Sequence, residues 1–148
     1  MWNSKKSALL SLIFVYCFMV ILALLEIFAP WITRSYLEIT GKSIELQPVL
    51  LCFLYACLPP LGYALWLLLG LIGSVRRGCC FSAANVNRLR RLSWCCFVLV
   101  PITLSLGIRY LPILLLAPFA AFMGLILRVV KNAFQTALEL QTENEMTI

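Results

Sequence analysis

The sequence predicts an all-α integral membrane bundle of four transmembrane helices, with a short amphipathic cytoplasmic helix between spans 2 and 3. The first observation is composition, because 63% of the 148 residues are hydrophobic and only 12% are charged. A soluble domain carries about 25% charged residues, and it could not cover so much apolar surface. The second observation is four apolar runs of roughly membrane-crossing length. We expect a single membrane domain over residues 1–148.

The first predicted span covers residues 8–29, an apolar run that follows two lysines. This run is longer than the apolar core of a signal peptide and no cleavage-site pattern follows it, so we expect an uncleaved helix. Pro30 and Trp31 are expected to end the helix at the membrane interface, where tryptophan is favoured. A polar connection is then predicted as far as Gln47.

The second predicted span covers residues 48–75, and two adjacent prolines in it are expected to kink the helix. The basic segment 76–91 follows and is predicted to be a cytoplasmic loop. Within this loop Ser82 is a favourable N-cap. Apolar and arginine side chains then recur at helical spacing, which predicts a short amphipathic helix over residues 83–91 on the inner membrane surface.

The third and fourth predicted spans cover residues 92–108 and 111–130, with a tight outer turn between them. No break signal follows the fourth span. Its helix is therefore expected to continue into a cytoplasmic C-terminal helix and tail, residues 131–148.

The distribution of positive charge predicts the orientation in the membrane. With four spans, Arg34, Lys42 and Arg109 share one side, and the other nine of the twelve Lys and Arg residues share the side that holds both termini. The richer side should be cytoplasmic. We therefore predict a multi-pass membrane protein with both termini on the cytoplasmic side. Its net charge of +6 then needs no nucleic-acid partner.

The composition also argues against catalysis. The chain has no histidine, no aspartate and only six acidic residues, so the commonest general base and most carboxylate pairs are missing. We predict no catalytic site, no cofactor and no metal, and we expect that the protein is not an enzyme.

The ionisable and thiol side chains nevertheless include candidates. Glu26 is the only acidic residue in a predicted span, and we expect it near the outer interface, exposed or paired with Arg109. The pairs 79–80 and 95–96 are adjacent cysteines, which is not the spacing typical of zinc sites, so structural or lipid-facing thiols are predicted. Juxtamembrane acylation is the minor alternative.

Two separated motifs resemble those of a known family. The segment CFSAANVNRLRRLSWCC is similar to x-F-[ST]-x-x-N-x-x-x-L-R-x-[IL] in the domain-of-unknown-function 2975 family of bacterial membrane proteins. The tail ELQTENEMTI resembles that family's ending, commonly close to EENDLTI, and the four-span layout is similar over nearly the whole chain. Cys80 and Ala84 depart from a common proline and a common glutamate. Carried over by position, the candidate interaction or structural residues are Phe81, Ser82, Asn85, Leu89, Arg90, Glu143, Asn144, Thr147 and Ile148.

The resemblance implies no established activity, but members of the family are often encoded beside a small helix-turn-helix regulator. It therefore implies a sensing or interaction partner of a cytoplasmic helix-turn-helix regulator, acting through the loop and the tail. In this picture Glu143 and Glu145 are expected to meet Arg88, Arg90 or Arg91.

Two other interpretations stay open. The motifs could cap and close the bundle from below, with a structural role only. The proline-broken spans are also compatible with a small oligomeric transporter, efflux or immunity protein, although the spans contain few polar residues.

Overall fold

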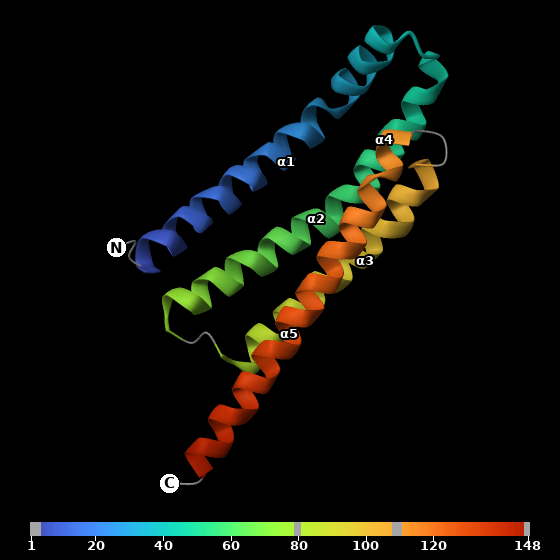
Figure 1. Cartoon of the computed structure of the whole chain (residues 1–148). Coiled ribbons are helices and arrows are strands. Elements are labelled where there is room, and N and C mark those ends of the chain that lie inside the picture. The colour runs from blue at the N-terminus through green and yellow to red at the C-terminus, as the bar shows by residue number, and fades with distance from the viewer. Residues whose placement is uncertain (1–3, 79–80, 108–110, 147–148) are drawn as a thin grey trace.

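The computed structural model describes residues 4–78, 81–107 and 111–146, and all of its regular elements are helical (Figure 1). In chain order they are α1 (Ser4–Thr40), the 3-10 turn η1 (Ile44–Leu46), α2 (Gln47–Arg76), α3 (Ala83–Gly107), α4 (Leu111–Leu114) and α5 (Leu116–Met146). Four helices are long and apolar enough to cross a membrane. The chain is therefore a multi-pass membrane protein, and the predicted all-α class with four spans is confirmed.

The long helices lie beside one another in chain order (Figure 1). Within the described ranges α1 packs against α2, α2 against α3, and α3 against α5, while α1 contacts neither α3 nor α5. The helices thus form an open row. Along the helix axes, the beginning of α1 and the end of α5 lie at one end of the bundle, and the α1–α2 connection lies at the other (Figure 1).

The first helix does not end at Pro30, contrary to the sequence prediction. It continues to Thr40 with Pro30 inside it. A proline removes the backbone donor to the carbonyl four residues earlier, here that of Glu26. The hydroxyl of Tyr55 on α2 lies 3.5 Å from this carbonyl oxygen and donates to it. A neighbouring helix therefore compensates the proline, as is typical of membrane helices.

The actual end of α1 lies at Gly41, whose φ of 64° is a left-handed conformation that glycine adopts without strain. The amide of Lys42 donates to the carbonyl of Leu37 at 3.1 Å, and the amide of Gly41 donates to that of Glu38 at 3.4 Å. These two bonds are the pair that closes a Schellman-type helix end. The connection to α2 is consequently short and includes η1.

The described residues between α2 and α3 form no separate amphipathic helix, so that prediction is wrong. Residues 83–107 form the single helix α3. The physical reason is local, because no proline or glycine interrupts the chain between Ala83 and Val100, and Pro101 is accommodated within the helix. The N-cap prediction is confirmed, since the hydroxyl of Ser82 accepts a hydrogen bond from the amide of Asn85 at 3.3 Å.

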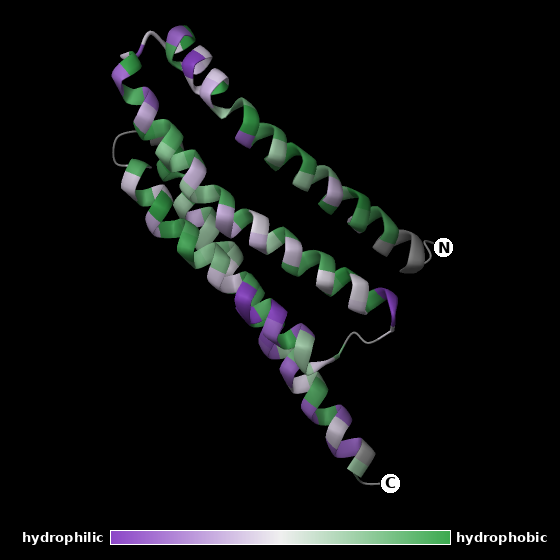
Figure 2. Cartoon of the chain, turned by 180° about the vertical axis from the view of Figure 1, so that it is seen from behind, coloured by the Kyte–Doolittle hydropathy of each residue, from purple (hydrophilic) through white to green (hydrophobic). Residues whose placement is uncertain are grey.

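Little apolar surface is buried between the helices. One core cluster joins α2 and α3, with Leu67, Leu92 and Cys95 at its centre and Leu127 of α5 packed against it. Most large apolar side chains of α1 are exposed, for example Ile27 at 71%. Apolar residues predominate along the middle of the long helices. Hydrophilic residues gather at the α1–α2 connection and toward the C-terminal end of α5, which extends past the start of α3 (Figure 2). This distribution suits helices whose outer surfaces face lipid.

Candidate functional site

The most polar contact between two spans joins α2 to α3 through Arg88. Its Nη1 atom donates to the carbonyl oxygen of Gly70 at 3.1 Å, to Oγ of Ser74 at 2.8 Å and to Oδ1 of Asn85 at 2.9 Å. The Ser74 hydroxyl also donates to the Gly70 carbonyl at 3.1 Å. Nη1 carries two hydrogens, so the three acceptors share them. All three acceptors are neutral, and dipoles rather than a carboxylate hold this guanidinium.

Small and polar residues at defined positions make this contact possible. Asn85 precedes Arg88 by three residues, which places both side chains on the same face of α3. Asn85 is fully buried at 0% exposure. A Cβ atom at Gly70 would lie 2.9 Å from Nε of Arg88, so only glycine leaves room for the guanidinium in its observed position.

The residues of the first motif have separate positions and contacts at the start of α3. The Phe81 ring packs against the ring of Phe134 on α5, with centroids 5.2 Å apart. Ser82 caps the helix, Asn85 belongs to the Arg88 network, and Leu89 is buried. Arg90 is exposed on the side that faces α5. The motif therefore connects α3 to both of its neighbours.

A polar groove of about 470 Å³ lies between the first turns of α3 and the free part of α5. We call it the α3–α5 groove, and it is lined by Ala83, Val86, Asn87, Arg90, Gln135, Leu138 and Glu139. The Gln135 amide donates to the carboxylate of Glu139 at 3.1 Å. The groove thus offers a cation, a carboxylate, two amides and three apolar side chains within one concave surface.

The tail motif lies farther along α5. Glu143 and Asn144 are exposed on its last turns, and this part of α5 extends past the beginning of α3 (Figure 1). Thr147, Ile148 and the side chain of Glu145 lie outside the described residues. The two motifs thus lie at the same end of the molecule. The contacts of Arg88 are with α2 and Asn85 rather than with Glu143.

The remaining candidates from the sequence are Glu26 and the two cysteine pairs. Glu26 is exposed and lines a groove of about 340 Å³ between α1 and α2, beside Tyr55. Its suggested partner, Arg109, lies outside the described residues, as does the cysteine pair 79–80. Cys95 is buried and Cys96 half-buried. Among the described residues no group of three or more His, Cys, Asp or Glu could hold a metal ion.

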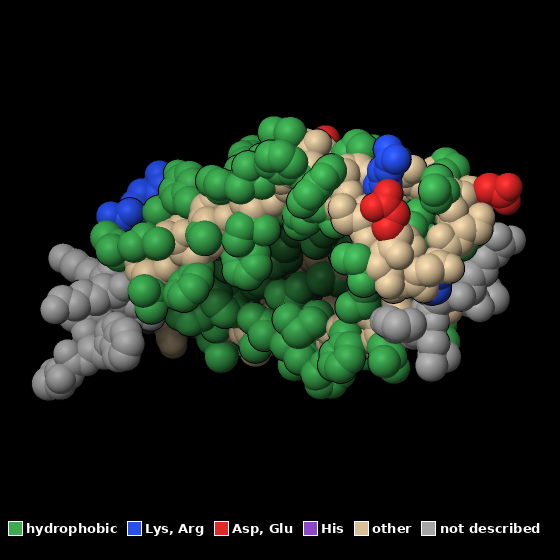
Figure 3. Space-filling model, turned by 90° about the horizontal axis from the view of Figure 1, so that it is seen from above, with side chains coloured by type: hydrophobic (Ala, Val, Ile, Leu, Met, Phe, Trp, Pro, Cys, Tyr) green, Lys and Arg blue, Asp and Glu red, His purple; other side chains and the backbone are tan. Residues whose placement is uncertain are grey.

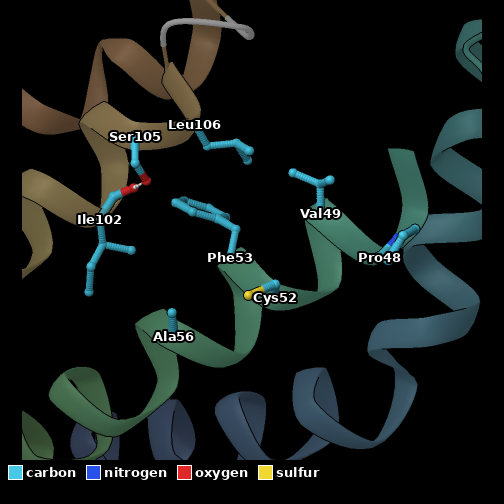
Figure 4. A pocket seen from close by; sticks show the side chains of 8 residues that line it. All are labelled: Pro48, Val49, Cys52, Phe53, Ala56, Ile102, Ser105 and Leu106. Carbon is cyan, nitrogen blue, oxygen red and sulfur yellow. Dashed lines mark hydrogen bonds between the residues drawn. The ribbon is translucent and has the colours of Figure 1, made fainter. Parts of the chain in front are cut away.

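An apolar pocket of about 660 Å³ lies between α2 and α3, near the α1–α2 connection (Figure 4). It is lined by Pro48, Val49, Cys52, Phe53, Ala56, Ile102, Ser105 and Leu106. The Ser105 hydroxyl donates to the carbonyl of Ile102 on its own helix at 2.7 Å. Viewed from above, the molecule also shows a hollow lined by hydrophobic side chains (Figure 3). No charged residue lines the pocket between α2 and α3, so nothing there would direct a reaction.

Sequence reasoning missed Gly70, Ser74 and the role of Arg88. A signal was present, because Gly70 and Ser74 form a small-x-x-x-small pattern, which favours close helix packing in membranes. The second half of that signal is the three-residue spacing of Asn85 and Arg88. Neither pattern alone predicts that this face of α2 packs against this face of α3.

Comparison with known proteins gives one match. The model of the family DUF2975, described as a protein of unknown function, matches residues 5–148. No curated protein and no solved structure shows significant similarity to the chain.

Proposed function

The chain belongs to the DUF2975 family, and on that premise we propose that it is a non-catalytic bacterial inner-membrane protein that binds a cytoplasmic helix-turn-helix regulator. The supporting observation is the α3–α5 groove at the end of the molecule that holds both termini. The nature of the partner follows what the sequence resemblance implies. The non-catalytic part of the proposal is supported by the absence of histidine and aspartate from the sequence.

The length of α5 supports a surface outside the membrane. A helix of 31 residues is about 46 Å long at 1.5 Å per residue, whereas the hydrocarbon core of a bilayer is about 30 Å thick. The polar part begins at Lys131. About ten residues of α5 therefore extend beyond the lipid core, and the groove lies on this extension.

The chemistry of the groove suits a protein helix as its ligand. Val86 and Leu138 supply apolar lining, and Arg90 and Glu139 supply charges of both signs. Amphipathic helices bind such grooves with an apolar face inward and charged residues at the rim. The Arg88 network fixes the first turns of α3 against α2, so a ligand in the groove would be coupled mechanically to the second span.

The orientation is part of the same proposal. The beginning of α1 and the end of α5 lie at the same end of the bundle as the connection from α2 to α3 (Figure 1). The sequence places nine of its twelve Lys and Arg residues on that side. The positive-inside rule then makes this side cytoplasmic, where a regulator could reach the groove.

The experiment is co-purification of the full-length protein, in detergent, with the regulator encoded by the neighbouring gene. Arg90→Glu places a like charge in the groove beside Glu139, and we expect it to weaken binding at least about tenfold. Lys42→Glu makes the same charge change at the opposite end of the molecule and should leave binding unchanged. Absence of binding by the wild-type protein, together with unchanged target-gene expression after deletion of the tail, would overturn the proposal.

One observation favours a second function, small-molecule transport. The groove between α1 and α2 has Glu26 as its one charged lining residue. Ionisable groups within membrane segments commonly mark transport pathways. A resistance or flux assay should then lose activity in Glu26→Gln, and unchanged flux in that variant would exclude this function.

A further inference from the structure

The basic residues in the middle of the chain have no acidic counterparts in the sequence around them. Between Glu45 and Glu139 there is not one Asp or Glu. The same stretch contains Arg76, Arg77, Arg88, Arg90, Arg91, Arg109, Arg128 and Lys131. Cations at a membrane surface attract anionic lipid. The charge that balances this stretch must therefore come largely from outside it.

One of these arginines lies at the end of an apolar groove between α2 and α3. The groove has a volume of about 340 Å³ and is lined by Pro59, Pro60, Tyr63, Arg91, Trp94 and Val98, with Cys95 beneath. Tyr63, Trp94 and Val98 are 38%, 55% and 48% exposed, so the groove is open to the surroundings of the helices. Apart from Arg91 and the Tyr63 hydroxyl, its lining is apolar. We call it the Arg91 groove.

The polar groups of the groove are arranged at one end. Nη1 of Arg91 donates to the hydroxyl oxygen of Tyr63 at 3.3 Å, which links α3 to α2. Val98 is seven residues, or about 10 Å, farther along α3 toward the apolar end. The Arg91 groove therefore has a charged mouth and an apolar body, which is the pattern of an amphiphile with an anionic head.

One ring that lines the groove also contacts a second cation. The guanidinium of Arg128 on α5 lies 5.4 Å from the centroid of the Trp94 ring, which itself lines the groove. Tyr63 also packs near Trp66, with ring centroids 5.9 Å apart. Tyrosine and tryptophan are enriched at the level of lipid headgroups. The mouth of the groove thus carries the features of an interfacial headgroup site.

From these observations we propose that the Arg91 groove binds one anionic phospholipid, with the phosphate at Arg91 and an acyl chain along Pro59, Pro60 and Val98. The proposal commits to a lipid because the protein is embedded in a bilayer and the groove body accepts only apolar groups. A guanidinium binds a phosphate with two parallel N–H donors. Tyr63 positions Arg91, and Trp94 forms the wall beside the second cation. This site is independent of the regulator proposed above, since the Arg91 groove lies between α2 and α3 and shares no lining residue with the α3–α5 groove.

The test is native mass spectrometry of the full-length protein released from nanodiscs that contain equal amounts of phosphatidylglycerol and phosphatidylcholine. We expect one retained phosphatidylglycerol on the wild-type protein. Arg91→Gln should reduce its retention about fivefold, the effect of one interfacial arginine. Arg76→Gln is the matched control, because it removes an exposed arginine at the end of α2 outside the groove.

A second variant tests the groove body without altering charge. Val98→Trp should fill the acyl part and lower lipid retention while Arg91 remains. Titration with inorganic phosphate distinguishes the two sources of the same anion, and we expect that phosphate alone does not displace the lipid. Equal losses in Arg91→Gln and Arg76→Gln would overturn the proposal, as would full retention in Val98→Trp or displacement by phosphate. Thermal unfolding of each variant checks that the fold is intact.

Discussion

The guanidinium of Arg88 on α3 lies 2.8 Å from the hydroxyl oxygen of Ser74 on α2, and this contact anchors the candidate motif to the second span. The buried amide oxygen of Asn85 holds the same guanidinium from its own helix. A hydrogen bond to a charged group contributes about 1.5–3 kcal/mol, more than one between neutral groups. The motif therefore has a structural role: Asn85 helps to hold the guanidinium that joins α3 to α2.

Asn85→Ala should destabilise the protein. The change removes the Oδ1 acceptor of Arg88 from a fully buried position, and a lost buried partner costs about 1–3 kcal/mol. Asn87→Ala is the matched control, because Asn87 lies two residues farther along α3 and is exposed. Thermal unfolding in detergent, followed by tryptophan fluorescence, measures both. Equal midpoints for the two variants would show that the Asn85–Arg88 bond has no role in stability.

Gly70→Ala should behave differently from Gly73→Ala on the same helix. A Cβ at Gly70 would lie 2.9 Å from Nε of Arg88 and displace the guanidinium, whereas at Gly73 the nearest atom is 3.8 Å away. Alanine is favoured over glycine within a helix by about 0.5–1 kcal/mol. We therefore expect Gly73→Ala to be neutral or stabilising and Gly70→Ala to be less stable than it by about 1 kcal/mol or more. The reverse order of unfolding midpoints would contradict the close approach.

Composition was sufficient to predict the helical class and the four spans, because lipid requires long apolar helices. Composition did not predict that α1 continues past Pro30, because the carbonyl that the proline leaves without a donor is satisfied by Tyr55 of another helix. The same limit applies to the predicted short helix at residues 83–91. The residues do follow an amphipathic pattern, but on the polar face Arg88 donates to α2 and Asn85 is buried beside it. A pattern along one helix does not specify which neighbour satisfies it.

The candidate site was predictable to a similar degree. The motif resemblance selected Phe81, Ser82, Asn85 and Leu89, and each of them has a defined contact or is buried. It could not select Gly70, because the role of a glycine depends on the side chain that approaches it. The position of the tail motif relative to the first motif could not be predicted from the sequence either, since it depends on how far α5 extends past α3.

Gly107→Ala should be the most damaging of the glycine substitutions. A Cβ there would lie 2.7 Å from Cα and 2.9 Å from the backbone nitrogen of Leu114, so α3 and α4 would have to separate. Backbone cannot move aside as a side chain does, and overpacking of this kind costs about 1–3 kcal/mol. Gly62→Ala serves as the control, because nothing lies within 4 Å of its added Cβ. A Gly107→Ala midpoint equal to that of Gly62→Ala would exclude this tight packing.

The Phe81–Phe134 ring pair should couple the start of α3 to α5 energetically. Its centroid distance of 5.2 Å and interplanar angle of 48° fall within the range of favourable aromatic pairs. A double-mutant cycle with Phe81→Ala and Phe134→Ala should give an interaction energy of about 0.5–1.5 kcal/mol. The matched cycle pairs Phe81→Ala with Phe122→Ala, which changes an exposed phenylalanine elsewhere on α5 and should be additive.

The comparison of the two cycles separates a specific contact from a general loss of apolar surface. If Phe81 contributed only apolar area, both cycles would be additive. If the ring pair fixes the polar extension of α5 against α3, only the Phe134 cycle deviates. The same two variants should then widen the α3–α5 groove, because Gln135 and Glu139 follow Phe134 on α5. Increased labelling of a cysteine introduced at Ala83, within the groove, would report that widening, and unchanged labelling would mean that α5 is held there by other contacts.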